Sequence, residues 1–265
     1  RDGKADLALA GGVHLCHDVA FWSVFSQLGA LSRRQEIRPF DRNADGLLIG
    51  EGIGMFVLKR AADARRDDNR IYALIRGTGT SSDGRDTGLM APGVEGQVLA
   101  LTRAWQDARL DPSTIGLVEA HGTATTAGDT AELTTLARVF GAVKGDRIPV
   151  GSVKSMIGHA MPAAGAAGLI KAALAVHHGV LPPTLHCDDP NPLLAQTRFR
   201  PLAVAQPWEA DLRRAAINAF GFGGINAHVI VDAPEAARRS AVRAPAGHAG
   251  DPALVAAAHS QDELV

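Results

Sequence analysis

The chain has 265 residues, 46% of them hydrophobic and 21% charged, a composition typical of a globular protein with room for one large domain or two smaller ones. Its 27 Lys and Arg residues nearly balance 28 Asp and Glu residues, so there is no basic field to attract nucleic acid. Two cysteines cannot build a disulfide framework, and the longest apolar stretch, 163–176, is too short for a membrane span and contains Lys171. We therefore expect a soluble, cytoplasmic protein.

Short apolar runs bounded by glycine or other turn residues predict seven strands along the chain. In order, they span 7–13, 54–59, 71–77, 116–120, 149–153, 215–219 and 228–232. Several of the segments between them have helical spacing instead. Strands that alternate with helices are typical of a layered α/β fold.

Three helices are predicted between the later strands. In 94–110 and in 128–141, apolar residues recur at spacings of three and four and make one apolar face on each segment. Asp129 and Glu132 resemble a capping box at the start of the second helix, and Gly141 is a suitable stop. The third helix, 163–178, is rich in alanine and ends at Gly179, so its small side chains would let it pass close to other backbone.

Three stretches combine small residues with side chains that can carry chemistry. They are EAHGTATTAGD (119–129) with His121, GSVKSMIGHAMPAAGAAG (151–168) with Lys154 and His159, and NAFGFGGINAHVIV (218–231) with glycines around Phe222. Each has an ordinary explanation when it is taken singly. A lone histidine is usually a hydrogen-bonded structural group, and a glycine-rich segment between strands is usually a turn.

Their combination favours a ligand site. Each histidine follows a predicted strand and precedes a helix of small residues, which is where α/β proteins tend to bind ligands. Two imidazoles at such a place could donate hydrogen bonds to a developing oxyanion or enolate. Thr123 and Thr125 could hold a polar, flexible substrate arm, and the glycines would let Phe222 fit closely against an acyl chain.

EAHGTAT, KSMIGHAMPAAGAAG and NAFGFGGINAHVI, in this order, resemble the three signature blocks of β-ketoacyl synthases, the ketosynthase domains of fatty-acid and polyketide synthases. The resemblance includes FDRNADGLLIGEGIGMFVLKR (40–60) and runs from about residue 4 to residue 235. It implies an α/β fold of the thiolase-like, layered αβαβα type. The chain would supply the end of the N-terminal half (1–68), the C-terminal half (69–235) and a linker toward a following domain (236–265).

The same resemblance implies an acyltransferase that catalyses a decarboxylative Claisen condensation. An acyl group is held on a cysteine, a malonyl-type extender arrives on acyl carrier protein, and the enolate formed by loss of carbon dioxide attacks the acyl thioester. The implied partners are acyl carrier protein, which delivers a phosphopantetheine arm, and a second copy in a homodimer. No metal and no directly bound cofactor is implied.

The matching positions imply roles for individual residues. His121 and His159 would position the extender and stabilise the enolate oxygen, and Lys154 would orient that region electrostatically. The implied substrate-binding residues are Thr123 and Thr125 on the phosphopantetheine arm and Phe220, Phe222 and Gly223 at the acyl pocket, where Phe222 is the gate.

The nucleophilic cysteine of the family lies in a TACSS-like block upstream of the segment that reads GKADLALAGGV (3–13) here, and this sequence begins after that point. Cys16 ends an apolar strand and Cys187 lies in a proline-rich connection, so neither has the cationic neighbour or helix N-terminus that activates a thiol. We interpret both as structural. These residues alone are therefore expected not to form the acyl-enzyme.

Two alternatives within the fold fit less well. A degradative thiolase would carry a further cysteine near GFGGINAHV, which has none, and a chalcone-synthase-like enzyme would pair histidine with asparagine, whereas this sequence offers His121 and His159. A non-condensing partner of the chain-length-factor kind, a decarboxylating loading variant and a module that only binds acyl carrier protein are the other candidates. The segment DPALVAAAHSQDELV resembles the stretch after a ketosynthase in modular polyketide synthases, which favours a multidomain parent.

Overall fold

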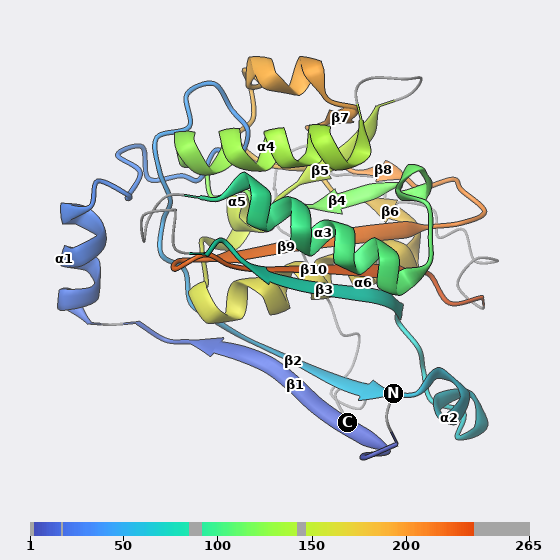
Figure 1. The fold of residues 1–265 in the computed structure, drawn as a ribbon. Helices are drawn as coiled ribbons and strands as arrows, with labels where there is room; N and C mark the ends of the chain where they lie inside the picture. Colours follow the sequence, from blue (N-terminus) through green and yellow to red (C-terminus); the bar gives the residue numbers. More distant parts are fainter. Residues whose placement is uncertain (1–2, 17, 85–91, 142–146, 236–265) are drawn as a thin grey trace.

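The computed structural model describes residues 3–16, 18–84, 92–141 and 147–235 (Figure 1). Its centre is a six-stranded mixed sheet in the order β3-β10-β9-β4-β5-β7. Three of its strands pair antiparallel, namely β3 (Leu74–Ser82), β10 (Ile225–Asp232) and β9 (Arg214–Gly221). The remaining three continue the sheet parallel to β9, namely β4 (Leu117–Glu119), β5 (Ile148–Gly151) and β7 (Phe199–Arg200).

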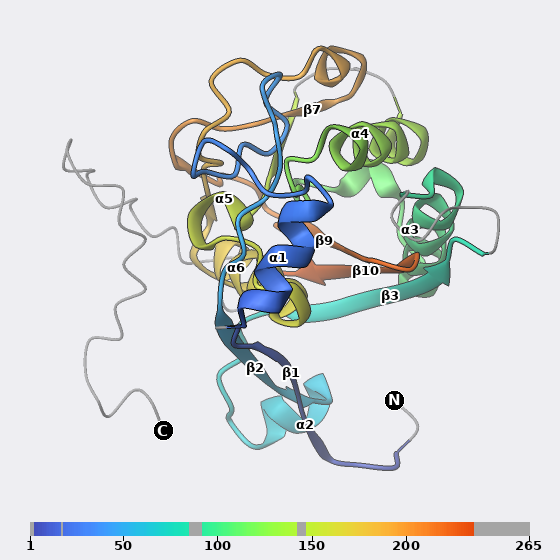
Figure 2. The same cartoon turned by 90° about the vertical axis from the view of Figure 1, so that its left-hand side faces the viewer.

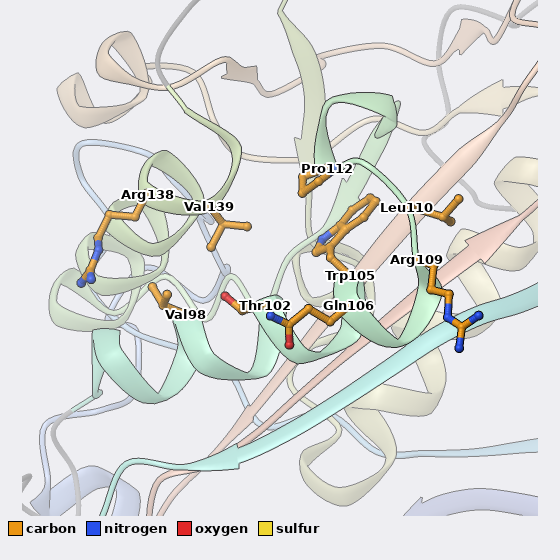
Figure 3. Close-up of a pocket in the computed structure, with 9 residues that line it drawn as sticks. All are labelled: Val98, Thr102, Trp105, Gln106, Arg109, Leu110, Pro112, Arg138 and Val139. Carbon is orange, nitrogen blue, oxygen red and sulfur yellow. The ribbon is translucent and has the colours of Figure 1, made fainter.

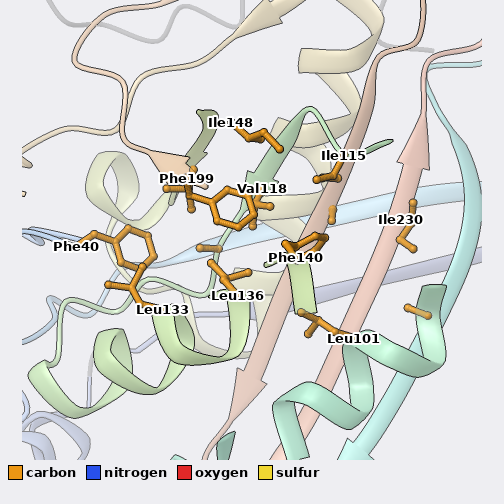
Figure 4. Packing of buried hydrophobic residues seen from close by; sticks show 14 of the residues in the cluster. Phe40, Leu101, Ile115, Val118, Leu133, Leu136, Phe140, Ile148, Phe199 and Ile230 are labelled. Atoms are coloured by element: carbon orange, nitrogen blue, oxygen red, sulfur yellow. The ribbon is translucent and has the colours of Figure 1, made fainter. Parts of the chain in front are cut away.

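Helices cover both faces of this sheet. One face packs against α3 (Val94–Ala108) and α4 (Thr126–Phe140), and the other against α6 (Ala164–His178) (Figure 1). Neighbouring strand residues divide between two cores: Val118 lies in the core beneath α3 and α4 (Figure 4), whereas Leu117 lies in the core beneath α6. The same division separates Ala216 from Ala215. Because strand side chains alternate between faces, strands that are mostly apolar produce a sheet buried on both sides.

Helix α6 is also covered on its other side, by the antiparallel strands β1 (Leu7–His14) and β2 (Gly52–Lys59) (Figure 2). A Cβ built on Gly54 would lie 2.8 Å from the Cβ of Ala166, so glycine and alanine permit the close approach that the alanine-rich sequence predicts. The order is therefore helices, sheet, helix, sheet. The outward face of this pair exposes apolar side chains: Leu9, Val13, Ile53, Met55 and Val57 are each more than half exposed.

The remaining elements are short. Helix α1 (Val19–Gln27) lies at one end of the molecule, facing the viewer in Figure 2, and begins where the carboxylate of Asp18 accepts a hydrogen bond from the N–H of Ala20. The others are α2 (Ala61–Arg66), α5 (Lys154–Ile157), the strands β6 (Val180–Leu181) and β8 (Gln206–Pro207), and the 3₁₀ turns Pro112–Thr114, Met161–Ala163 and Pro192–Gln196. No helix in the described ranges is long and apolar enough to cross a membrane.

All seven predicted strands are confirmed, with ends that differ by up to five residues. The largest shift is in β3, which begins at Leu74 and continues to Ser82. The three predicted helices are also confirmed, and Gly141 and Gly179 follow α4 and α6 with positive φ, as expected of C-terminal glycines. Helices α1, α2 and α5 were not predicted. The expected linker, 236–265, lies outside the described residues.

Candidate active site

The turn that carries His121 is fixed by a buried carboxylate. The backbone N–H groups of His121 and Gly122 donate to the two carboxylate oxygens of Glu132, both at 2.8 Å. The side-chain amide of Asn218 on β9 donates to the same carboxylate at 2.8 Å. Because Glu132 is buried in α4, it ties the turn after β4 to a helix on one side and to the neighbouring strand on the other.

A second buried carboxylate fixes the rest of this turn. Asp129 accepts hydrogen bonds from the N–H of Ala124 at 3.1 Å and from the N–H of Phe40 at 2.7 Å. Ala124 has a φ of 58°, a left-handed conformation that these contacts hold in place. Burial raises the pKa of Asp129 to about 7, against the opposing effect of its hydrogen bond from Phe40.

The predicted capping box of Asp129 and Glu132 is therefore wrong. Helix α4 begins at Thr126, and its N-cap is Thr125, whose hydroxyl oxygen accepts a hydrogen bond from the N–H of Gly128 at 3.2 Å. Asp129 and Glu132 lie deeper in the helix, where their carboxylates bind loop backbone rather than the N–H groups of the helix.

The imidazole of His121 has a defined tautomer. Its Nδ1 accepts a hydrogen bond from the N–H of Phe220 at 3.4 Å, and its ring packs 5.6 Å from the ring of Phe220, measured between centroids. A ring nitrogen that accepts is unprotonated, so in the neutral ring the proton is on Nε2. His121 therefore presents an N–H donor at Nε2.

His159 has the same tautomer through a different contact. It follows Gly158, whose φ of 75° ends the single turn of α5, and its Nδ1 accepts a hydrogen bond from the N–H of Met161 at 3.0 Å. Its backbone is held to the segment before β2, because its N–H donates to the carbonyl oxygen of Leu48 and its own carbonyl accepts from Gly50. The rings of His121 and His159 are 5.5 Å apart and nearly perpendicular, at 82°.

Burial keeps both histidines neutral. It lowers the pKa of His159 to about 3 and holds the pKa of His121 well below its ordinary value, and the Lys154 ammonium acts in the same direction on both. Lys154 is itself only 3% exposed, and burial lowers its pKa to about 8. At neutral pH the site thus combines two uncharged Nε2–H donors with one buried cation.

Of the five proposed substrate-binding residues, Thr123, Thr125 and Phe220 lie beside His121 or its turn, and Phe222 and Gly223 lie in the turn that joins β9 to β10. Thr123 is buried, and its hydroxyl oxygen lies 3.2 Å from that of Thr125, so the two hydroxyls form a pair beside the His121 turn. Phe220 is buried against His121, whereas Phe222 is 51% exposed and meets the edge of Phe25 on α1, with ring centroids 5.7 Å apart. Gly223 has a φ of 83° in the turn that joins β9 to β10.

Sequence reasoning missed several residues that build this site. Glu132 and Asp129 were interpreted as caps, and the polar residues behind them, Asn218 and His228, were treated only as part of a glycine-rich motif. His228 is fully buried, and its Nδ1 lies 2.6 Å from the Oδ1 of Asn218. Polar side chains at 218 and 228 inside otherwise apolar strands were the available signal, because buried polar groups require partners.

A surface groove in the described residues lies away from the histidines. It has a volume of about 460 Å³ and runs between α3 and α4 on the outside of the molecule (Figure 3). Its lining comprises Val98, Thr102, Trp105, Gln106, Arg109, Leu110, Pro112, Arg138 and Val139. Neither histidine lines it, so the groove is separate from the candidate site.

Three family models match the chain in succession. The model for the beta-ketoacyl synthase N-terminal domain matches residues 1–64, the model for its C-terminal domain matches 72–188, and the ketoacyl-synthetase C-terminal extension matches 190–265. The chain belongs to the β-ketoacyl synthase family. The family that the motifs predicted is therefore confirmed.

Polyketide synthases are among the proteins whose sequences are similar to this chain. It is 43% identical to a phenolphthiocerol/phthiocerol polyketide synthase of Mycobacterium tuberculosis over 238 residues, which are 88% of this chain and 13% of that protein. It is 40% identical to the pikromycin polyketide synthase component PikAIII of Streptomyces venezuelae over 256 residues, which are 93% of this chain and 16% of that protein. The chain thus spans a small part of the relatives it matches.

Solved ketosynthases share its fold. The ketosynthase from module 6 of the bacillaene synthase of Bacillus subtilis 168 superimposes with a TM-score of 0.84 at 36% identity, over 87% of this chain and 43% of that one. The oxazolomycin ketosynthase domain of Streptomyces albus JA3453 gives 0.84 at 39% identity, over 88% and 42%. The predicted fold class, a thiolase-like layered α/β fold, is therefore confirmed, and the chain spans less than half of each of these ketosynthases.

Proposed function

We propose that these residues form the histidine-bearing part of a β-ketoacyl synthase that extends an acyl chain by decarboxylative Claisen condensation, in polyketide or fatty-acid synthesis. The observation that carries the proposal is the pair of buried imidazoles, His121 and His159, whose rings lie 5.5 Å apart and whose Nδ1 atoms each accept a backbone N–H, which leaves Nε2 of each as the donor. The extender would be a malonyl-type thioester on acyl carrier protein, and the intact enzyme would be a homodimer.

The two Nε2–H groups suit the oxygen on which charge develops in this reaction. They would donate to the thioester carbonyl of the extender, the carboxylate would leave as carbon dioxide, and the electron pair of the broken C–C bond would enter the enolate. The enolate carbon would then attack the acyl thioester and expel the thiolate that held the acyl group. Neutral donors are suitable because a protonated imidazolium at the same place would protonate the enolate.

The nucleophile is proposed to come from outside residues 1–265. The chain has only two cysteines, and burial together with the nearby carboxylates of Asp41, Asp129 and Asp188 raises the pKa of Cys187 to about 12. Cys187 is therefore a thiol rather than a thiolate at any physiological pH, which is the opposite of an activated nucleophile. Cys16 is tied through its backbone N–H to Glu51 at 2.5 Å.

Phe222 is proposed to gate the acyl pocket, since its ring is half-exposed and contacts the buried ring of Phe25 at its edge. Replacing it with alanine should broaden the range of acyl chain lengths in the product, because the ring would no longer limit the space beside Phe25. Chromatography of the products measures this range. Tyr72→Ala, which removes another half-exposed ring, is the control; an unchanged profile in Phe222→Ala would count against the gate.

Acyl transfer to the enzyme tests the proposed function. A ketosynthase-length polypeptide that includes residues 1–265 is incubated with a radiolabelled acyl thioester, and carbon dioxide release from a malonyl thioester is followed in parallel. Covalent labelling that depends on a cysteine, together with carbon dioxide release, is the expected result.

Other outcomes point to other members of the fold. Carbon dioxide release without labelling would make the protein a decarboxylating loading variant. Absence of both activities would make it a structural partner of the chain-length-factor kind. Either outcome would overturn the proposed condensation.

A further inference from the structure

A buried ion pair lies directly behind the site and has no role in the chemistry described above. The carboxylate Oε2 of Glu119, at the end of β4, is 2.8 Å from the Nζ of Lys171 on α6. Their side chains are only 3% and 7% exposed. Removing two charges from water is unfavourable and is often no better for stability than an apolar pair of the same size. A buried pair at this position therefore needs a reason other than stability.

The second oxygen of Glu119 holds the residue next to Lys154. The N–H of Val153 donates to Oε1 of Glu119 at 2.6 Å, and Val153 is the residue from which α5 starts. Lys154 is the first residue of that helix. One oxygen of the Glu119 carboxylate thus contacts Lys171. The other accepts from the backbone at Val153, which fixes where the side chain of Lys154 begins.

The pair also connects the three segments that carry the site. Glu119 is two residues before His121, Val153 precedes Lys154, and Lys171 is on the helix that follows His159. Helix α6 makes room for the carboxylate, because a Cβ built on Gly168 would lie 3.1 Å from the Cγ of Glu119. A side chain at 168 would press on Glu119, so the glycine allows the pair to form.

Charge links the pair to Lys154 as well. Lys154 is surrounded by buried charges from three elements. Burial lowers its pKa, and the Glu119 carboxylate is the charge that most strongly raises it again. The Lys171 ammonium lowers the pKa of Lys154 further. The other groups that face Lys154 are Glu132 and Asp129 on α4 and the imidazoles of His121 and His159. The two members of the pair therefore act on Lys154 with opposite sign.

We propose that Glu119 and Lys171 are a positioning pair for Lys154. Glu119 fixes the start of α5, and its negative charge attracts the Lys154 ammonium. Lys171 holds Glu119 in place, and its positive charge repels the Lys154 ammonium. The role of the pair in turnover rests on the proposed function. Neither residue contacts the substrate in this scheme, and both act through Lys154.

The test compares Glu119→Gln, Lys171→Met and the double variant in a ketosynthase-length polypeptide. Glutamine keeps an oxygen for the N–H of Val153, so it removes the charge and retains the acceptor. Carbon dioxide release from malonyl-N-acetylcysteamine is followed against pH, and the reactivity of Lys154 toward acetic anhydride is followed against pH by mass spectrometry. The second measurement needs no turnover. Glu95→Gln and Lys59→Met, both in ion pairs away from the site, are the matched controls.

Wild-type activity is expected to fall above about pH 8, where Lys154 loses its proton. Glu119→Gln should move this fall to lower pH, by about 1 unit, since an attracting charge is lost. Lys171→Met should move it to higher pH, because a repelling charge is lost and Glu119 is left without its partner. The double variant should return toward wild type, and the labelling curve of Lys154 should move in the same directions.

The positioning pair would be overturned if the Lys154 labelling curves of the two single variants moved equally along the pH axis, or did not move. This holds even if both variants lost activity. A structural role would lower the rate without moving the two curves in opposite directions. Opposite shifts in labelling without carbon dioxide release in the wild type would support the pair and overturn the proposed function. The two ideas therefore fail separately.

Discussion

His121→Ala and His159→Ala are each expected to reduce condensation by about 100- to 1,000-fold, the usual effect of removing one donor from an oxyanion site. Each substitution deletes one Nε2–H and leaves the other in place, because the two tautomers are set by separate backbone groups, Phe220 and Met161. Decarboxylation of the extender should fall with condensation, whereas acyl loading, which precedes enolate formation, should be reduced less. Single-turnover assays of the three steps separate these effects.

The control for this pair is His178→Ala. His178 is an exposed histidine in the last turn of α6 and belongs to no contact of the candidate site. It should leave all three steps unchanged. Condensation at the wild-type rate in both His121→Ala and His159→Ala would remove these histidines from the mechanism, and equal losses of loading and decarboxylation would show that the substitutions damaged the fold.

Mild acidification below pH 7 should leave the imidazoles of His121 and His159 neutral. Because burial lowers the pKa of His159 to about 3, the imidazole stays neutral in the folded protein down to about that pH. The unfolded chain binds a proton at this residue from about pH 6.5 downward, so the free energy of unfolding falls as the pH decreases from 6.5 toward 3. Acid is therefore expected to act on this histidine through loss of stability before it acts through loss of the donor.

Much of the central sheet was predictable because β4, β5 and most of β9 are buried on both faces. Runs such as 116–120 and 215–219 are apolar except for one polar residue each, Glu119 and Asn218, and a mostly apolar run is the pattern of a strand between two layers of helices. The alanine-rich segment that became α6 was predictable for a related reason: a helix between two sheets needs small residues such as Ala166 where it approaches Gly54. Local composition and layer position agree in these elements.

Helices α1 and α5 were not predictable for different physical reasons. Helix α1 has apolar residues on most of its surface, with Val19, Trp22 and Val24 exposed, so its sequence has no clear polar face. Helix α5 is one turn of four residues, which is too short for any periodicity. It forms because Glu119 and Ser152 hold the residues at its start, contacts that come from the tertiary structure.

The histidines of the site were predictable, and the groups that orient them were not. His121, Lys154 and His159 follow strands at positions where the sequence changes from apolar to polar. Glu132 and Asp129 occupy helical positions where carboxylates commonly cap a helix, and only the path of the loop before α4 shows that they bind loop backbone instead. A buried carboxylate in a helix has the same local sequence as an exposed one, so its partners must be known from the fold.

Glu132→Ala is expected to lower the free energy of unfolding by about 3 kcal/mol or more. The substitution leaves three buried donors without an acceptor, the N–H groups of His121 and Gly122 and the amide of Asn218, and each unsatisfied donor costs about 1–3 kcal/mol. Part of this loss is offset, because the substitution also removes the unfavourable burial of a negative charge. That same burial raises the pKa of Glu132. Denaturant unfolding of the ketosynthase-length protein measures the balance.

Glu132→Gln and Glu95→Ala distinguish the possible causes. Glutamine keeps one acceptor oxygen but turns an NH₂ group toward a backbone N–H, so its stability should lie between wild type and Glu132→Ala. Glu95 is an exposed carboxylate on α3 that pairs with Arg138, and its loss should leave the unfolding midpoint unchanged. Were Glu132→Ala as stable as Glu95→Ala, the His121 turn would keep its shape without the carboxylate. The orientation of the His121 ring would then depend on the N–H of Phe220.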